Sequence, residues 1–345
     1  MREPPRPTDE ALRLQALCAT NLVDTPIEER FERLTRLAQQ MFSVPIAAIS
    51  LVTEKRQWFK SIQGLDVQET SRDISFCGHA ILNPEELLVV RDARLDSRFE
   101  DNPLVTADPK IRFYAGCPVK SSDGLTLGTI CIIDRVPRDL ASEDLWPLKD
   151  IAALVETELH RERASAVQDQ LIASLSQEGR VELIDPVTRL WNRSGMERLF
   201  KHAQALRVHK QLPVGEMLIK FDGLDDIAGR YSDRARDEAL RHVARRLLNC
   251  CRNQDVVGRW DGSTFMMLIE AGDRQSLEEI ADRVLTRFRE QKINTEVGEV
   301  GINATLGLAF HEAAPDDEGA PFCEAAANAL ARGVERGGNC IEQAW

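Results

Sequence analysis

The first 140 residues combine two hydrophobic periods. Residues 9–42 repeat apolar side chains every three to four positions, which predicts helices, and the repeat breaks at Asp24-Thr25-Pro26. A run from Pro45 to Val52 that is rich in Ile, Val and Ala predicts a strand. Shorter apolar runs near glycines predict further strands: Trp58-Phe59, Leu87–Val90, Ala115–Val119 and Leu127–Ile133. This mixture predicts an α+β domain that ends near Leu140.

Residues 145–175 contain no glycine, and their single proline, Pro147, falls where a first helical turn accepts one. Apolar residues recur there at mixed spacings of three and four: Leu148, Ile151, Val155, Leu159, Val167 and Leu171. We expect a long amphipathic helix, which either pairs with a second copy as a parallel coiled coil or packs on its own domain. Residues Ser176–Arg180 are expected to join it to a second domain.

The remaining residues alternate between strand and helix patterns. The expected strands are Glu216–Phe221, Val256–Gly258, Phe265–Ile269 and Ile302–Phe310. The expected helices are Asp233–Asn249, Leu277–Phe288 and Phe322–Arg332. A tight turn at Asp261-Gly262 makes a hairpin of the second and third strands. An antiparallel hairpin with covering helices predicts a ferredoxin-like α/β sandwich.

Composition narrows the class of protein. The 345 residues carry a formal charge of −12, and both halves are acidic, which argues against a nucleic-acid partner. No apolar run approaches the roughly 18 residues of a membrane span, and MREPPRPTDE lacks the apolar core of a signal peptide. The eight cysteines show no CxxC spacing. We therefore expect a cytoplasmic protein with reduced thiols and no membrane contact.

Two stretches resemble known families. Residues 11–160 resemble a GAF sensor domain, through the runs RQWFKS (56–61), RDISFCGHA (72–80), DNP (101–103) and LGTIC (127–131). Residues 181–345 resemble a GGDEF domain, the diguanylate cyclase fold, because DPVTRLWNR (185–193) is close to the family's D-x-L-T-G-L-x-N-R. The resemblance implies a GAF domain at 1–143, a helical linker at 144–180 and a GGDEF domain at 181–345.

The family's signature loop is altered in this chain. The family reads G-G-D-E-F after an arginine and an aromatic residue, and the corresponding residues are Arg259, Trp260, Asp261, Gly262, Ser263, Thr264 and Phe265. The resemblance implies that the two acidic positions hold Mg²⁺ or Mn²⁺ at the triphosphate of GTP. Ser263 and Thr264 stand there, and neutral hydroxyls cannot act as the anionic ligands that hard cations prefer.

The first strand of the second domain carries a change of charge. The family pattern D-x-D-x-F-K becomes Lys220-Phe221-Asp222-Gly223-Leu224-Asp225, with Lys220 where the resemblance implies a metal ligand. A unit charge about 4 Å away contributes on the order of 4 kcal/mol at an effective dielectric constant near 20. We therefore expect Lys220 to repel a divalent cation, and we expect no metal and no cofactor.

Other nucleotide contacts that the resemblance implies are also reduced. Ala228 replaces a guanine-binding asparagine, while the corresponding aspartate remains as Asp237. Val334 and Gly338 replace two basic residues that grip phosphates, although Arg336 lies nearby in the sequence. We therefore expect no enzymatic activity. The alternative is a weak diguanylate cyclase that makes cyclic di-GMP from two GTP molecules, rescued by Asp222, Asp261 or Arg336.

A ligand-binding role remains open in the second domain. Many members of the family bind cyclic di-GMP at R-x-x-D, five residues ahead of the signature, and Arg252 and Asp255 stand there. A guanidinium pairs with phosphate or guanine, and a carboxylate accepts hydrogen bonds from guanine. The same pattern also begins at Arg6, Arg98, Arg230 and Arg234. The expectation is a cyclic di-GMP receptor or a scaffold that contacts another signalling protein, dimeric through its linker helix and GAF domain.

The first domain offers cysteine and histidine side chains. Cys77, His79, Cys117 and Cys131 would suit metal or redox sensing, although no third and fourth ligand follows at a recognisable spacing. The simpler interpretation is that the thiols are core residues and that His79 bonds a backbone group. Trp58 and Phe59 line either a small-ligand pocket or the core.

Overall fold

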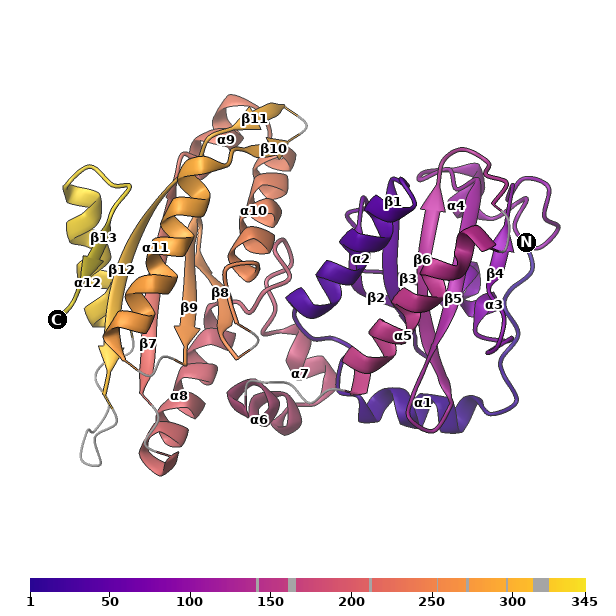
Figure 1. Ribbon diagram of the computed structural model, residues 1–345, viewed down its shortest axis with the longest axis horizontal. Coiled ribbons are helices and arrows are strands. Elements are labelled where there is room, and N and C mark those ends of the chain that lie inside the picture. The colour runs from indigo at the N-terminus through magenta and orange to yellow at the C-terminus, as the bar shows by residue number, and fades with distance from the viewer. Residues whose placement is uncertain are drawn as a thin grey trace. The chain divides into compact units, whose positions relative to one another are not determined.

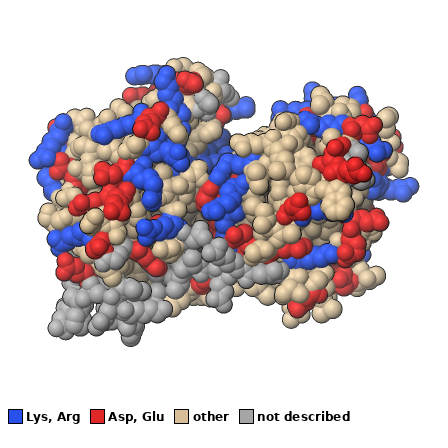
Figure 2. Space-filling model, viewed as in Figure 1, with Lys and Arg blue, Asp and Glu red and all other residues tan. Residues whose placement is uncertain are grey.

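The computed structural model describes residues 1–140, 143–160, 166–210, 213–252, 254–270, 273–295, 297–312 and 323–345. The chain divides into two compact units, Met1–Glu162 and Arg163–Trp345. No helix among the described residues is long and apolar enough to cross a bilayer. Acidic and basic side chains are interspersed on the face that Figure 2 shows for each unit.

The first unit is built on a six-stranded antiparallel sheet with the order β3-β2-β1-β6-β5-β4. Its strands are β1 (Ile46–Val52), β2 (Arg56–Gln63), β3 (Glu69–Ser71), β4 (Leu88–Val90), β5 (Phe113–Lys120) and β6 (Thr126–Asp134). Its helices are α1 (Glu10–Ala19), α2 (Glu29–Met41), η1 (Arg72–Ile74), α3 (Phe76–Ala80), α4 (Pro103–Thr106), η2 (Glu143–Leu145) and α5 (Trp146–His160).

Helices cover both faces of this sheet (Figure 1). The α2 and α5 helices pack on one face, where Phe31 and Val155 are fully buried. The short α3 and α4 helices pack on the other, where Phe76 stacks on Phe99 with ring centroids 3.9 Å apart. Every residue of β1 is buried, as expected for a central strand covered on both sides. The predicted strand from Pro45 to Val52 is thus confirmed.

The second unit has a five-stranded sheet with the order β13-β12-β7-β9-β8 and a separate β10–β11 ribbon. The strands are β7 (Val214–Asp222), β8 (Val256–Asp261), β9 (Thr264–Ile269), β10 (Ile293–Thr295), β11 (Gly298–Val300), β12 (Asn303–His311) and β13 (Ile341–Gln343). The helices are α6 (Ala166–Ser174), α7 (Gln177–Val181), α8 (Arg193–Lys210), α9 (Leu224–Arg230), α10 (Asp233–Leu248), α11 (Arg274–Glu290) and α12 (Glu324–Glu335).

The second sheet also has helices on both faces (Figure 1). Leu218 of β7 packs with α8 and α12 on one face. Phe221, three residues further on, contacts Phe288 of α11 on the other face, with ring centroids 4.5 Å apart. The hairpin of β8 and β9 confirms the predicted hairpin, but its turn residues are Gly262 and Ser263 rather than Asp261 and Gly262, because Asp261 still pairs with Thr264. The predicted ferredoxin-like α/β arrangement is confirmed, whereas α8, α9 and the β10–β11 ribbon were not predicted from the sequence.

Within residues 145–175, the described part of the chain contains α5 before residue 161 and α6 after residue 165. The apolar side of α5 packs on the first sheet, and α6 packs on α8 through Leu171 and Ile172. Residues 161–165 lie outside the described residues, so the continuous linker helix and its coiled coil stay predictions. The described part of the last helix is Glu324–Glu335, and its predicted first residue, Phe322, lies outside the described residues.

Candidate functional site

The altered signature lies at the turn of the β8–β9 hairpin. Asp261 pairs with Thr264 across the turn, and Gly262 between them has a φ of +31°. Phe265 points into the core, where its ring meets Phe221 edge-on at 5.6 Å. Ser263 is buried at the turn, and its carbonyl oxygen accepts a hydrogen bond from the Phe221 amide. The hairpin is therefore fixed to the end of β7.

Lys220 lies in a row of three residues across the sheet. It stands opposite Thr264 of β9 and Thr305 of β12. Residues paired directly across antiparallel strands project from the same face, and Thr305 lies against Gly333 of α12. Lys220 is partly buried, and no carboxylate among the described residues pairs with it. The row presents an ammonium between two hydroxyl-bearing side chains.

Two carboxylates lie near this row. The Ser263 hydroxyl donates a 2.8 Å hydrogen bond to Asp225 Oδ2, which joins the start of α9 to the hairpin. Asp222 Oδ2 lies 3.5 Å from the Thr305 hydroxyl. Asp225 was missed as a site residue in the sequence analysis. The sequence did contain a signal for Asp225. The family pattern D-x-D-x-F-K begins with an acidic residue and ends with a basic one, whereas this chain has Lys220 at the first position and Asp225 at the last.

The donor set at this place does not fit a divalent metal ion. Ser263, Thr264 and Lys220 stand at the three family positions, and hard cations require charged oxygen ligands. Among the described residues, no three or more His, Cys, Asp or Glu side chains are grouped so that they could hold a metal ion. No reaction step is therefore assigned to a metal held by these residues.

The loop after α12 leaves little room beside Asp222. Gly338 has a φ of +76°, and a Cβ added there would lie 2.9 Å from Asp222 Oδ2 and 3.0 Å from Thr305 Oγ1. Arg336, suggested above as a rescuing group, pairs instead with Glu342 of β13 at 2.5 Å. Val334 is 38% exposed and carries no charge. These residues therefore bring no basic side chain to Asp222.

An ion pair ties the segment that begins at Asp185 to the hairpin. Arg259 Nη1 lies 3.2 Å from Asp185 Oδ2, and the same guanidinium donates to the Gly262 carbonyl oxygen. Asp185 also accepts from the Thr188 amide and hydroxyl at 2.7 and 2.8 Å. Sequence reasoning missed this pair. It holds the hairpin turn in place and leaves Asp185 with a structural role.

Other predicted contacts lie elsewhere in the second unit. Asp237 is on α10 and pairs with its neighbour Arg236 at 3.1 Å. Ala228 is on α9. None of the hydrogen bonds and ion pairs between described residues brings Asp237 to Lys220 or Asp222.

Arg252 and Asp255 lie in the turn between α10 and β8. Arg252 is exposed, and its backbone amide donates to Asp255 Oδ2 at 2.7 Å. Asp255 is 6% exposed, and its Oδ1 has no hydrogen-bond partner among the described residues. Burial raises the pKa of Asp255, against the lowering effect of Arg252. The structure brings the two residues together, with Asp255 shaping the turn and Arg252 facing solvent.

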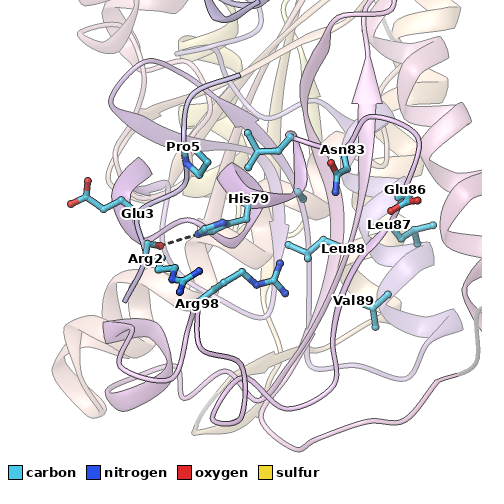
Figure 3. A pocket seen from close by; sticks show the side chains of 12 residues that line it. Arg2, Glu3, Pro5, His79, Asn83, Glu86, Leu87, Leu88, Val89 and Arg98 are labelled. Atoms are coloured by element: carbon cyan, nitrogen blue, oxygen red, sulfur yellow. Dashed lines mark hydrogen bonds between the residues drawn. The ribbon is translucent and has the colours of Figure 1, made fainter. Parts of the chain in front are cut away.

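The first unit contains an open cavity of about 560 Å³ beside α3. Figure 3 shows His79 in its lining, directed at the main-chain oxygen of Arg2 at 3.0 Å, with Arg98 nearby. Burial lowers the pKa of His79. The structure therefore agrees with the interpretation that His79 forms a hydrogen bond to a backbone group.

Trp58 and Phe59 lie on opposite faces of the first sheet, and the cysteines of this unit are also divided between the two faces. Trp58 lies in the core beside α2, whereas Phe59 lines a second cavity of about 170 Å³ on the other face of the sheet. Cys117 lies in the core cluster on the α5 side. Cys77 and Cys131, on the α3 side, come within 4.0 Å of each other.

Comparisons with known families agree with these two folds. The family described as "GAF domain" matches residues 26–159, and the family described as "Diguanylate cyclase, GGDEF domain" matches residues 182–340. The chain is a GAF domain followed by a GGDEF domain.

Three similar proteins illustrate the relationship. A stretch of 171 residues, 49% of the chain, is 42% identical to the cyclic di-GMP phosphodiesterase PA2567 of Pseudomonas aeruginosa and covers 29% of it. A stretch of 161 residues, 46% of the chain, is 27% identical to the diguanylate cyclase DosC of Escherichia coli K12 and covers 34% of it. The chain thus spans about a third of the length of these relatives. The solved GGDEF domain of PA1120 from P. aeruginosa is 23% identical, with a TM-score of 0.42, over 46% of this chain and 98% of that one.

These matches contradict the prediction that the chain is not an enzyme. The GGDEF family is described as that of diguanylate cyclases, and DosC is a named diguanylate cyclase. Both point to an enzyme. The prediction rested on the residues that replace family ligands, such as Lys220, Ser263 and Thr264, and family membership outweighs it.

Proposed function

We propose that this chain acts in the cytoplasm in cyclic di-GMP signalling, as a slow diguanylate cyclase with a GAF sensor domain. It would join two GTP molecules into cyclic di-GMP and release pyrophosphate. Relatedness to DosC supports the reaction class. The observation that carries the assignment in this chain is the unpaired, partly buried ammonium of Lys220 at the end of β7.

Lys220 suits an anionic ligand. A lysine binds phosphate as a point charge with three donors, and a partly buried one gains more from a bound anion than a fully solvated one does. Thr264, on one side, adds a neutral hydroxyl donor, whereas the Thr305 hydroxyl on the other side is directed at Asp222 Oδ2. One ammonium neutralises a single charge where a divalent ion neutralises two, so slow turnover is expected. Because each domain would hold one GTP, two copies would act together as a homodimer.

An assay of nucleotide products tests this function. The full chain is incubated with GTP and Mg²⁺ or Mn²⁺, and cyclic di-GMP is measured by mass spectrometry. We expect slow product formation that falls at least tenfold in Lys220→Met, on the scale of removing one electrostatic contact in an active site.

A matched control uses Lys201→Met, which removes an exposed lysine of α8. Its rate should equal that of the wild type. Asp222→Ala tests the carboxylate beside Thr305 in the same assay. Absence of product from the wild type with either ion would overturn the proposed activity.

A second candidate function is binding of cyclic di-GMP at Arg252. The exposed guanidinium lies on a turn that the buried Asp255 holds by a 2.7 Å hydrogen bond, which favours this site. We propose that Arg252 contacts the ligand and that Asp255 positions it. Calorimetry should show binding to the wild type, strong weakening in Arg252→Ala, and no change in Arg198→Ala, which removes an exposed arginine of α8. Equal heats from all three proteins would rule out the site.

A further inference from the structure

Two cysteine thiols meet inside the GAF domain. Cys77 of α3 and Cys131 of β6 are 54 positions apart in sequence, and their Sγ atoms are 4.0 Å apart. The two residues are 1% and 0% exposed. A disulfide bond is about 2.05 Å long, so the sulfur atoms need to approach by about 2 Å to bond.

Polar hydrogens surround this pair. The Tyr114 hydroxyl donates to Cys77 Sγ at 3.3 Å. Ser50 and Thr129 face each other across β1 and β6, and both are fully buried. Among the described residues, the Ser50 and Thr129 hydroxyl oxygens have no hydrogen-bond partner. Buried polar groups are ordinarily satisfied, so these two hydroxyls are available to an anion that forms beside them.

The surroundings favour the thiolate of Cys77. Burial alone raises the pKa of the Cys77 thiol, but the nearby S–H and O–H groups of Cys131, Thr129, Tyr114 and Ser50 together outweigh burial and lower it to about 7. The pKa of Tyr114 is raised well above its usual value by burial and by the two thiols, so its hydroxyl stays protonated and donates. A thiolate is the nucleophilic form of cysteine.

Small molecules have a route to Cys77. The cavity of about 170 Å³ is lined by Cys77 and Tyr114, and its lining extends to the exposed Val67. Water takes about 30 Å³ in the liquid, so this volume accommodates a hydroperoxide. Cys131 does not line the cavity. The geometry therefore gives the two thiols different roles, one reached from the cavity and one behind it.

We propose that Cys77 and Cys131 are a hydroperoxide-reactive pair that closes a reversible disulfide within the GAF domain. The Cys77 thiolate attacks the peroxide, an S–O bond forms as the O–O bond breaks, and the departing hydroxide takes a proton and leaves as water. The Cys131 sulfur then attacks the Cys77 sulfenic acid, an S–S bond forms as the S–O bond breaks, and a second water leaves. Two thiols are oxidised and one peroxide is reduced; a dithiol reductant reverses the change. This site does not depend on the proposed cyclase activity.

Closing the bond would move α3 rather than β6. The β6 strand lies between β1 and β5 and is paired with both along its length. The α3 helix has only five residues. The same helix carries His79, which contacts the Arg2 carbonyl oxygen at the 560 Å³ cavity (Figure 3). Oxidation would therefore change the shape of that cavity and the contact of the N-terminal segment.

Peptide mapping tests the proposal. The folded full chain is treated with hydrogen peroxide, denatured, alkylated and digested. We expect the Cys77 and Cys131 peptides to be joined, the intact mass to fall by two hydrogen atoms, and a dithiol reductant to restore both. In Cys131→Ala the second step is blocked, so dimedone should trap a sulfenic acid at Cys77.

Two controls keep the result specific. Cys117→Ala removes a buried thiol on the opposite face of the sheet and should leave the crosslink unchanged. Circular dichroism of each variant establishes that it folds. The proposal fails if Cys77 and Cys131 are both alkylated after a dose that oxidises the exposed Cys18, or if the mass loss persists in Cys77→Ala.

Discussion

Two lysines, one in each domain, show how differently a buried ammonium is used. Lys60 of β2 is fully buried, and its Nζ contacts Thr25 Oγ1 at 2.8 Å, the Pro26 carbonyl oxygen at 2.7 Å and Glu28 Oε1 at 2.6 Å. Lys220 of β7 is partly buried, with no carboxylate partner among the described residues. A buried charge whose donors are all satisfied belongs to the fold. An unpaired charge at a strand end is available to a ligand.

The largest expected effect is on the stability of the GAF domain. Lys60→Met removes the ammonium and leaves Glu28 without that partner, so the free energy of unfolding should fall by about 3–5 kcal/mol. Chemical denaturation measures it. Lys55→Met is the matched control, because Lys55 precedes β2 and is exposed. If the two variants lose equal stability, the ammonium of Lys60 does not stabilise the GAF domain more than an exposed lysine does.

The second expected effect concerns crowding near Lys220. Gly337 and Gly338 both have positive φ, but open space surrounds a Cβ at Gly337, whereas one at Gly338 meets Asp222 and Thr305. Both alanine variants pay the backbone cost of a positive φ, about 1–3 kcal/mol. Gly338→Ala should lose more unfolding free energy than Gly337→Ala. Equal losses would mean that the Asp222 side of the site is not crowded.

The third prediction concerns another buried ion, the thiolate of Cys77 in the GAF domain. Tyr114→Phe removes a donor to Cys77, so the thiolate is less favoured and the pKa of Cys77 should rise from about 7. A hydrogen bond of about 0.5–1.5 kcal/mol corresponds to roughly half to one pKa unit. The pKa of Cys77 is obtained from the rate at which iodoacetamide alkylates the Cys77 peptide, measured as a function of pH.

The control for this profile is Tyr231→Phe, which changes an exposed tyrosine of the GGDEF domain. Cys117 in the same sample gives an internal reference, because burial raises its pKa to about 11. A profile for Cys77 that stays unchanged in Tyr114→Phe would remove Tyr114 from the thiolate's support.

The smallest stability effect is expected at the other lysine. Lys220→Met should change the free energy of unfolding by less than about 0.5 kcal/mol, because no partner is left unpaired. The same variant should weaken GTP binding, measured by calorimetry. A large loss of stability in Lys220→Met would place Lys220 with Lys60 as a structural residue.

The sequence predicted the fold where local patterns decide it. The β1 strand and the α2 helix follow from the hydrophobic pattern, and the β8–β9 hairpin follows from turn chemistry, with its turn one residue beyond the predicted position. The α8 helix was missed although its buried Met196, Leu199, Phe200 and Ala203 recur at helical spacing, and α9 was missed because it has only seven residues. A helix as short as α9 depends on packing for its stability.

The site was only partly visible in the sequence. The family pattern located Lys220, Ser263 and Thr264, since it aligns residue by residue. Long-range contacts were not accessible: the Arg259–Asp185 pair spans 74 positions and the Cys77–Cys131 contact spans 54. Spacing along a chain carries no information on such pairs, which depend on which strands and helices become neighbours.

One short helix has a consequence for the sensor half of the molecule. Residues of α3 line both GAF cavities, with Phe76 and Cys77 on the smaller one and His79 and Ala80 on the larger. One short helix thus contributes side chains to the lining of both cavities. A ligand that binds in one cavity and displaces α3 would reduce the volume of the other cavity. Binding in one cavity should therefore lower the affinity of the other cavity for its ligand.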